Sequence, residues 1–190
     1  MIRLLFAAPL LLLTACVLPP DRLEGDAPPP VVDQVDLDRY AGRWFEIARY
    51  DVSFQEGCEG VTAQYAPLPS GRIEVINACR KGGLDGELDT VTGEARVVEG
   101  SNGAKLEVSF FGPFFFGDYW VIELADDYSW AVVSEPRGRF LWILSRTPQM
   151  EQSVLDARLE RLRTIGYDTG ALRYTEQWES LEAAPPPVQP

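Results

Sequence analysis

Gly42-Arg43-Trp44 begins the first strand-like segment of this chain, and Leu141-Trp142-Ile143-Leu144-Ser145-Arg146-Thr147-Pro148 ends the last. A first strand with Gly-x-Trp and a last strand ending in Arg suit a small closed barrel, in which Trp44 plugs one end and the Arg146 guanidinium covers its ring. Such a cation–π pair contributes about 0.5–2 kcal/mol. A barrel of this size is either filled by its own side chains or holds one small ligand.

Eight segments of strand composition follow one another at short, regular spacing, a pattern typical of an antiparallel barrel or sandwich. They are Tyr40–Tyr50, Val61–Tyr65, Arg72–Asn77, Glu87–Val97, Lys105–Phe111, Tyr119–Leu124, Trp130–Ser134 and Phe140–Ser145. A short strand over Leu172–Thr175 is expected to end the domain.

One helix is expected after the eighth strand. Thr147 is its predicted N-cap, Pro148 its first residue and Gly166 its stop. The stripe that would pack on the outer wall of the barrel is formed by Leu155, Leu159 and Leu162.

The first fifteen residues have the features of a signal peptide, with Arg3 before the apolar stretch 4–13. The segment closes in Leu13-Thr14-Ala15-Cys16, which resembles the lipobox of bacterial lipoproteins. In that motif the cysteine is acylated, palmitate being one expected chain, and anchors the protein to a membrane. An ordinary cleavage site with a chance cysteine is the alternative. The resemblance also implies sorting to the outer membrane, facing the periplasm, because Val17 stands where an inner-membrane signal would have Asp.

Composition divides the remaining chain into three parts. Residues 16–34 hold five prolines and predict a semi-rigid spacer behind the lipidated cysteine. Residues 35–178 form the single folded domain. The proline-rich residues 179–190 are predicted to be a disordered tail.

The chain is acidic, with a formal net charge of −12. Arg3 is the only charged residue in segment 1–15. The chain without this segment has 16 Lys+Arg and 29 Asp+Glu, and its net charge is −13. No basic stretch interrupts this excess, which argues against nucleic acid as a partner. Contact with a membrane is expected to come from the lipid anchor.

Two cysteines remain after Cys16. If the turn of the second and third strands is centred between Leu68 and Pro69, Cys58 and Cys79 face each other, within disulfide reach. An exported chain meets an oxidising compartment, so a Cys58–Cys79 bridge is expected. Two free thiols or a metal site are the alternatives.

The residues that most enzymes use are missing. The chain has no histidine, which removes the commonest general base and metal ligand. No nucleophile elbow, phosphate-binding loop, dinucleotide fingerprint or Cys-x-x-Cys motif occurs. The sequence therefore predicts no catalytic residue, no metal and no cofactor, and it leaves binding open.

Five of the nine phenylalanines gather in Phe110-Phe111-Gly112-Pro113-Phe114-Phe115-Phe116. Alternate side chains of a strand face opposite ways, so these rings cannot all point inward. Some are expected at the barrel mouth or in an outer patch for a partner, which leaves a homodimer open.

Taken together, these stretches resemble the lipocalin family, and specifically bacterial lipocalins related to apolipoprotein D. The matching segments are Gly42-Arg43-Trp44-Phe45-Glu46-Ile47-Ala48-Arg49, Val75-Ile76-Asn77, Val108-Ser109-Phe110-Phe111-Gly112-Pro113-Phe114 and Leu141 to Pro148. Gly117-Asp118-Tyr119 departs from the family's usual Thr-Asp-Tyr. The resemblance implies an all-β fold, an eight-stranded antiparallel up-and-down β-barrel, or calyx, with one C-terminal α-helix packed outside.

The resemblance also implies a hydrophobic ligand, such as a fatty acid or lysophospholipid, and positions that line its pocket. Trp142 and Tyr65 match aromatic pocket residues, and Asn77 falls in a matching stretch. Strand alternation adds residues on the same faces, and Phe54 is expected at the mouth. The full expected ligand-binding set is Trp142, Tyr65, Asn77, Val75, Phe54, Phe140 and Leu144, with Gly42, Trp44 and Arg146 closing the floor.

Three functions fit these features. The first is a membrane-anchored protein that stores or transports lipid in the barrel. The second is an enzyme on the same barrel, which would need a tyrosine or carboxylate acid. The third is a structural lipoprotein with a filled barrel and a phenylalanine assembly patch.

Overall fold

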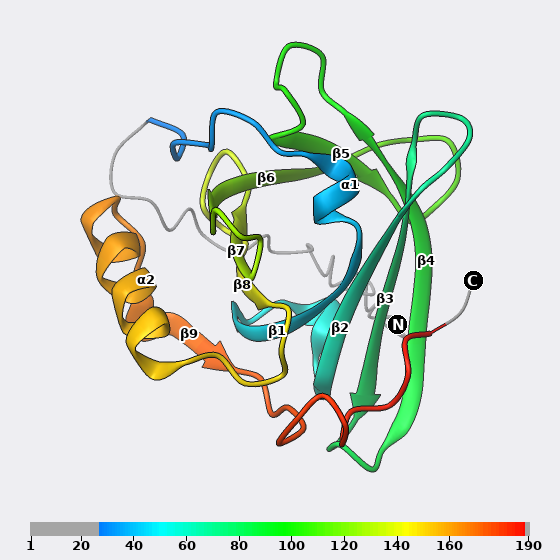
Figure 1. Cartoon of the computed structure of the whole chain (residues 1–190), viewed down its shortest axis with the longest axis vertical. Coiled ribbons are helices and arrows are strands. Elements are labelled where there is room, and N and C mark those ends of the chain that lie inside the picture. Colours follow the sequence, from blue (N-terminus) through cyan, green and yellow to red (C-terminus); the bar gives the residue numbers. More distant parts are fainter. Residues whose placement is uncertain (1–26, 189–190) are drawn as a thin grey trace, which may run out of the picture.

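The computed structural model describes residues 27–188, and within them one nine-stranded antiparallel sheet curls into a barrel (Figure 1). The sheet order is β2-β3-β4-β5-β6-β7-β8-β1-β9, and β1 also pairs with β2, which closes an eight-stranded barrel. The strands are β1 (Gly42–Tyr50), β2 (Cys58–Pro67), β3 (Ile73–Lys81), β4 (Glu87–Val97), β5 (Lys105–Ser109), β6 (Gly117–Leu124), β7 (Trp130–Ser134), β8 (Leu141–Ser145) and β9 (Leu172–Tyr174). The expected barrel is confirmed, and the sandwich alternative is excluded. The predicted signal peptide and Cys16 lie outside the described residues.

Alternation along the strands separates an inner from an outer apolar cluster. In β8, Trp142 and Leu144 belong with Trp44 to the inner cluster, whereas Leu141 and Ile143 face the other way. The inner cluster runs through the barrel from Trp44 at the floor to Trp142 near the far end. The outer cluster joins the barrel wall to the helix.

Helix α2 (Gln152–Thr164) packs outside the barrel, as expected (Figure 1). Its buried residues are the predicted Leu155, Leu159 and Leu162. The predicted start at Thr147 is wrong, because the Thr147 hydroxyl donates to the Gln149 carbonyl and holds a turn. The helix begins after Glu151 instead, and Gly166, at φ +94°, follows its end as predicted.

The β2–β3 hairpin corrects the predicted register while confirming the disulfide. Tyr65 pairs with Val75 and Pro67 with Ile73, so the turn is centred on Ser70. A turn there would put Cys58 opposite Gly82, and a register shift between Glu59 and Thr62 puts it opposite Lys81 instead, not opposite Cys79. The Cys58 and Cys79 Cα atoms are 5.4 Å apart and the bridge forms, which excludes free thiols and a metal site at this pair.

Removal of this disulfide is expected to destabilise the barrel. The bridge joins residues 21 positions apart, and closing a loop of that size contributes about 3 kcal/mol through loss of chain entropy in the unfolded state. The double variant Cys58→Ala/Cys79→Ala should lower the free energy of unfolding in urea by about that amount. The same loss should appear in the unchanged chain under reductant, and reductant should leave the variant unaffected. Equal stability of the two proteins would contradict the prediction.

Both segments that flank the barrel lie against it. The end of the predicted spacer packs on the wall, where the Val32 N–H donates to the Val121 carbonyl, and the short helix α1 (Leu37–Tyr40) follows. The predicted disordered tail is described as far as Val188, and it too lies against the barrel. Its Pro185 carbonyl accepts a 2.6 Å hydrogen bond from Arg43 on the outer face of β1, and Trp178 packs on Gly60 of β2.

Candidate functional site

Trp44 and Arg146 meet at the floor of the barrel as the sequence predicts. The Arg146 Cζ lies 3.8 Å from the centroid of the Trp44 ring, which is fully buried. The guanidinium donates to the main-chain carbonyls of Arg39, Tyr40, Arg43 and Tyr128. Arg146 therefore ties α1, β1 and the β6–β7 turn together around the indole.

Gly42 supplies the backbone conformation that this arrangement requires. Its φ is +94°, in the left-handed region that favours glycine, whereas a Cβ there would only touch Arg146 Nη1, at 3.4 Å. The glycine of Gly-x-Trp thus lets the chain turn from α1 into β1 against the guanidinium.

Three tyrosines lie directly above the floor. The Tyr119 hydroxyl is hydrogen-bonded to the hydroxyls of Tyr40 (2.7 Å) and Tyr65 (2.9 Å). Burial raises the pKa of Tyr65 to about 12 and raises the pKa of Tyr40 and Tyr119 well above the usual value. The three hydroxyls therefore stay protonated at neutral pH and act as hydrogen-bonding groups.

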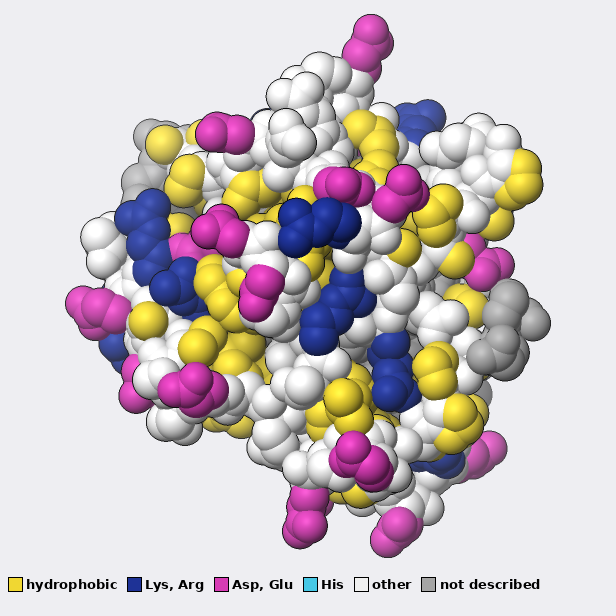
Figure 2. Space-filling view, in the orientation of Figure 1, with side chains coloured by type: hydrophobic (Ala, Val, Ile, Leu, Met, Phe, Trp, Pro, Cys, Tyr) yellow, Lys and Arg dark blue, Asp and Glu magenta, His cyan; other side chains and the backbone are white. Residues whose placement is uncertain are grey.

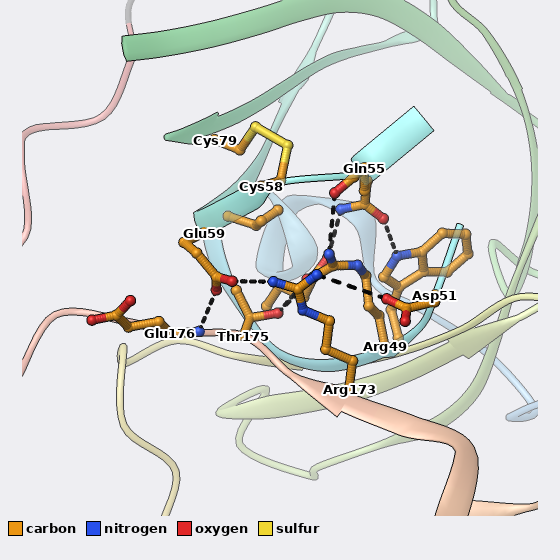
Figure 3. A network of polar contacts seen from close by, with 12 residues as sticks. Arg49, Asp51, Gln55, Cys58, Glu59, Cys79, Arg173, Thr175 and Glu176 are labelled. Atoms are coloured by element: carbon orange, nitrogen blue, oxygen red, sulfur yellow. Dashed lines mark hydrogen bonds and ion pairs between the residues drawn. A yellow bond between two sulfur atoms is a disulfide. The ribbon is translucent and has the colours of Figure 1, made fainter. Parts of the chain in front are cut away.

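A buried polar network lies higher in the barrel (Figure 3). Arg49 is fully buried and donates to the Glu46 carboxylate (2.7 Å), the Thr175 hydroxyl (3.0 Å) and the Gln55 carbonyl (3.2 Å). Glu46, only 2% exposed, also accepts from the Gln55 side-chain amide. Charges this deep are costly unless they are paired and hydrogen-bonded, and here each charge neutralises the other.

The sequence does not predict this network. The one available signal is two charges in the otherwise apolar stretch Phe45-Glu46-Ile47-Ala48-Arg49-Tyr50 of β1. A second charged contact, Arg173 with Glu59, joins β9 to β2 beside it (Figure 3). Glu59 also accepts from the Glu176 N–H at 2.6 Å. These contacts hold β9 and the residues after it against β2, in the region where β1 and β2 no longer pair with each other.

Aromatic rings surround the end of the barrel opposite Trp44. Trp142 pairs with Arg49, five residues along β1 from Trp44, and is half-buried. Its ring stacks on the Phe140 ring with centroids 5.9 Å apart, and the Phe54 and Phe140 ring centroids are 6.2 Å apart. The Trp142 indole N–H donates to the Gln55 side-chain carbonyl at 3.0 Å. Phe54 is 64% exposed, so this aromatic group reaches from the interior to the solvent.

The seven expected ligand-binding residues thus fall at two depths. Tyr65, Val75 and Leu144 are buried in the inner cluster with Trp44. The aromatic group at the far end consists of Phe54, Phe140 and Trp142. Asn77 is half-buried, between Ala63 of β2 and Val91 of β4.

The described part of the chain holds no group of three His, Cys, Asp or Glu side chains placed to bind a metal ion. Among residues 27–188, no helix has both the length and the apolar character needed to cross a membrane. Figure 2 shows positive, negative and hydrophobic side chains interspersed over the face it draws.

The chain is a closed eight-stranded antiparallel barrel with a plugged floor and aromatic rings at the far end, a class whose interior is either filled by side chains or holds one small ligand. Comparison with known proteins then gives the family. A family model described as a lipocalin-like domain matches residues 35–177, so the chain belongs to the lipocalin family.

The relatives agree with this assignment. The outer membrane lipoprotein Blc of Vibrio cholerae is 41% identical over 169 residues, covering 87% of this chain and 93% of the relative. Mouse apolipoprotein D is 34% identical, covering 78% and 80% of the two chains. Among solved structures, insecticyanin of the tobacco hornworm superposes with a TM-score of 0.65 at 20% identity, over 87% of this chain and 90% of that one, and supports the fold.

Proposed function

We propose that this protein binds a small amphipathic lipid, such as a fatty acid or lysophospholipid, inside the barrel and stores or transports it. The observation that carries the proposal is the aromatic group of Phe54, Phe140 and Trp142, which continues from the solvent to the inner apolar cluster, against which Trp142 packs. Apolar walls with a few placed polar groups are typical of small-molecule sites. The Gln55 amide and the tyrosine hydroxyls would supply those groups.

The proposed location is the outer membrane, with Cys16 lipidated and the barrel facing the periplasm. Relatives from Vibrio cholerae and Escherichia coli that cover most of this chain are named outer membrane lipoproteins. The lipobox-like Leu13-Thr14-Ala15-Cys16 supports the same placement. Radiolabelled palmitate should be incorporated into the unchanged chain and not into Cys16→Ala.

The structure favours binding over catalysis on this barrel. An enzyme without histidine would need a tyrosine or a carboxylate acid, and burial raises the pKa of the three interior tyrosines. The interior carboxylate of Glu46 is engaged by Arg49, Gln55 and Thr175. The tyrosines therefore stay protonated at neutral pH, and the Glu46 carboxylate is occupied by its three partners.

Binding can be tested through Trp142. Titration with a single-chain fatty acid or lysophospholipid should quench tryptophan fluorescence, and Trp142→Phe should remove most of the quenching because this ring lies in the proposed site. Trp178→Phe is the matched control, since Trp178 packs outside the barrel on Gly60. Mass spectrometry of the purified protein should show bound lipid. Absence of both bound lipid and quenching would refute the proposed function, and unchanged quenching in Trp142→Phe would refute the placement.

A further inference from the structure

The phenylalanine run between β5 and β6 is not used by the proposed ligand site. Three of its rings are among the most exposed large hydrophobic side chains of the described residues: Phe111 at 86%, Phe114 at 61% and Phe116 at 85%. We call these three the phenylalanine patch. Single exposed apolar residues are ordinary, but a cluster on one loop indicates an interaction surface.

The other two rings of the run hold the loop in place. Phe110 packs against the inner cluster, over Gly93 of β4. Two guanidiniums lie over the Phe115 ring. The Cζ atom of Arg96 is 4.6 Å from the ring centroid, and that of Arg72 is 5.4 Å from it. The Ser109 hydroxyl donates to the Gly112 carbonyl at 2.8 Å and fixes the turn between them. These contacts hold the loop against the barrel, and the three rings of the patch face the solvent.

A second copy of the chain is a poor occupant for the patch. Three phenylalanines of about 200 Å² each, 61–86% exposed, offer about 450 Å² of surface. A stable protein interface needs about 800 Å² from each partner. The patch is therefore too small to hold a dimer together without a further surface.

The groups beside the patch fit a lipid surface. Arg72 and Arg96 have half-exposed side chains and pair with Glu94 and Glu107. Glu74 and Asp118 lie opposite these two carboxylates on the neighbouring strands, so the surroundings of the patch are not basic. Aromatic rings next to arginines are typical of the boundary between lipid headgroups and acyl chains. A zwitterionic bilayer, which neither attracts nor repels an acidic protein, suits this arrangement.

The segment that leads back to the proposed anchor leaves the barrel on the wall formed by β6. The N-terminal segment meets the barrel where the Val32 N–H bonds to Val121 of β6. Val121 is four residues along β6 from Gly117, where the phenylalanine loop ends, or about 13 Å at the rise of a strand. Figure 1 shows the β5–β6 loop beside the β2–β3 turn, on the outside of the barrel. Because the proposed lipid at Cys16 already attaches the protein to the bilayer, the patch is at high effective concentration there. A low intrinsic affinity of the three rings for the bilayer is then enough to keep them inserted.

We infer that the phenylalanine patch inserts into the bilayer that carries the lipid anchor and sets the orientation of the barrel on it. The inference rests on lipidation at Cys16 and not on the presence of a ligand in the barrel. It assigns Phe111, Phe114 and Phe116 a membrane partner.

The test uses the full acylated chain reconstituted into phosphatidylcholine vesicles, with a nitroxide on Phe114→Cys. Collision with oxygen, which concentrates in acyl chains, is compared with collision with a water-soluble nickel chelate. The matched control carries the label on Glu160→Cys, on the exposed face of α2. The label at 114 should show a ratio of oxygen to nickel collisions about threefold or more above that at 160. In a chain that carries the label at position 114 together with Phe111→Ser and Phe116→Ser, the ratio of oxygen to nickel collisions should fall to the value measured at position 160.

Equal ratios at 114 and 160 would overturn the inference, as would a chain that does not float with the vesicles. Spin–spin broadening at 114 that grows with the protein-to-lipid ratio would assign the patch to a second copy and would overturn it too. Tryptophan quenching by added lipid in the same samples reports the barrel site separately, so the proposed function stands or fails on its own result.

Discussion

Replacement of Arg146 by alanine is expected to lower the free energy of unfolding by about 3 kcal/mol or more, because hydrogen bonds to a charged group contribute about 1.5–3 kcal/mol each. The guanidinium donates to four main-chain carbonyls, which would lose this donor together. The Trp44 ring, which has no exposed surface, would also lose the cation that covers it.

Urea unfolding followed by circular dichroism measures this loss. Arg146→Lys keeps the charge over the indole but cannot reach four carbonyls at once, so it should recover only part of the stability. Arg137→Ala, at an exposed turn, is the control and should change stability by less than about 0.5 kcal/mol. If Arg146→Ala unfolded at the same urea concentration as Arg137→Ala, the floor would not depend on the guanidinium.

The fold and the floor could be predicted because both depend on the period of two along a strand. Once Trp44 and Arg146 are placed together, alternation fixes which face of β8 looks inward, and Leu144 and Trp142 do lie there. The same rule could not locate the β2–β3 turn. Alternation does not say which loop residue lies at the centre of a turn. The bulge at Glu59–Thr62, where Gly60 has φ +56° and its N–H bonds to the Glu176 carbonyl, then moves the partner of Cys58 by one further residue, also without a distinct signal.

The buried network escaped prediction for a different reason. Charged residues usually face water, so the presence of Glu46 and Arg49 in a strand does not by itself predict a buried ion pair. Their partners come from elsewhere: Gln55 from the segment after β1, and Thr175 from the far end of the chain after β9. Thr175 reaches Glu46 only because β9 pairs with β1 and its chain then runs on toward β2. Contacts that depend on chain segments so far apart require the fold to be known.

The network also gives the second large expected effect. Glu46→Leu should lower the free energy of unfolding by about 3–5 kcal/mol, because it leaves the fully buried Arg49 without a counter-charge. Arg49→Met should cost a similar amount, since it leaves Glu46 buried and charged. The double variant Glu46→Leu/Arg49→Met should cost much less than the sum, because two apolar side chains of similar size replace a buried ion pair at little net cost.

Urea unfolding of the four proteins forms a double-mutant cycle that isolates the interaction between the two side chains. A coupling of about 2 kcal/mol or more would show that each charge is retained because of the other. The single variants also separate stability from binding. The Trp142 indole is held by Gln55, and Gln55 in turn by Glu46, so Glu46→Leu should alter Trp142 fluorescence even where the barrel stays folded. Additive losses in the cycle would mean that the two charges are stabilised independently, by Thr175 and Gln55, and that the pair itself contributes nothing.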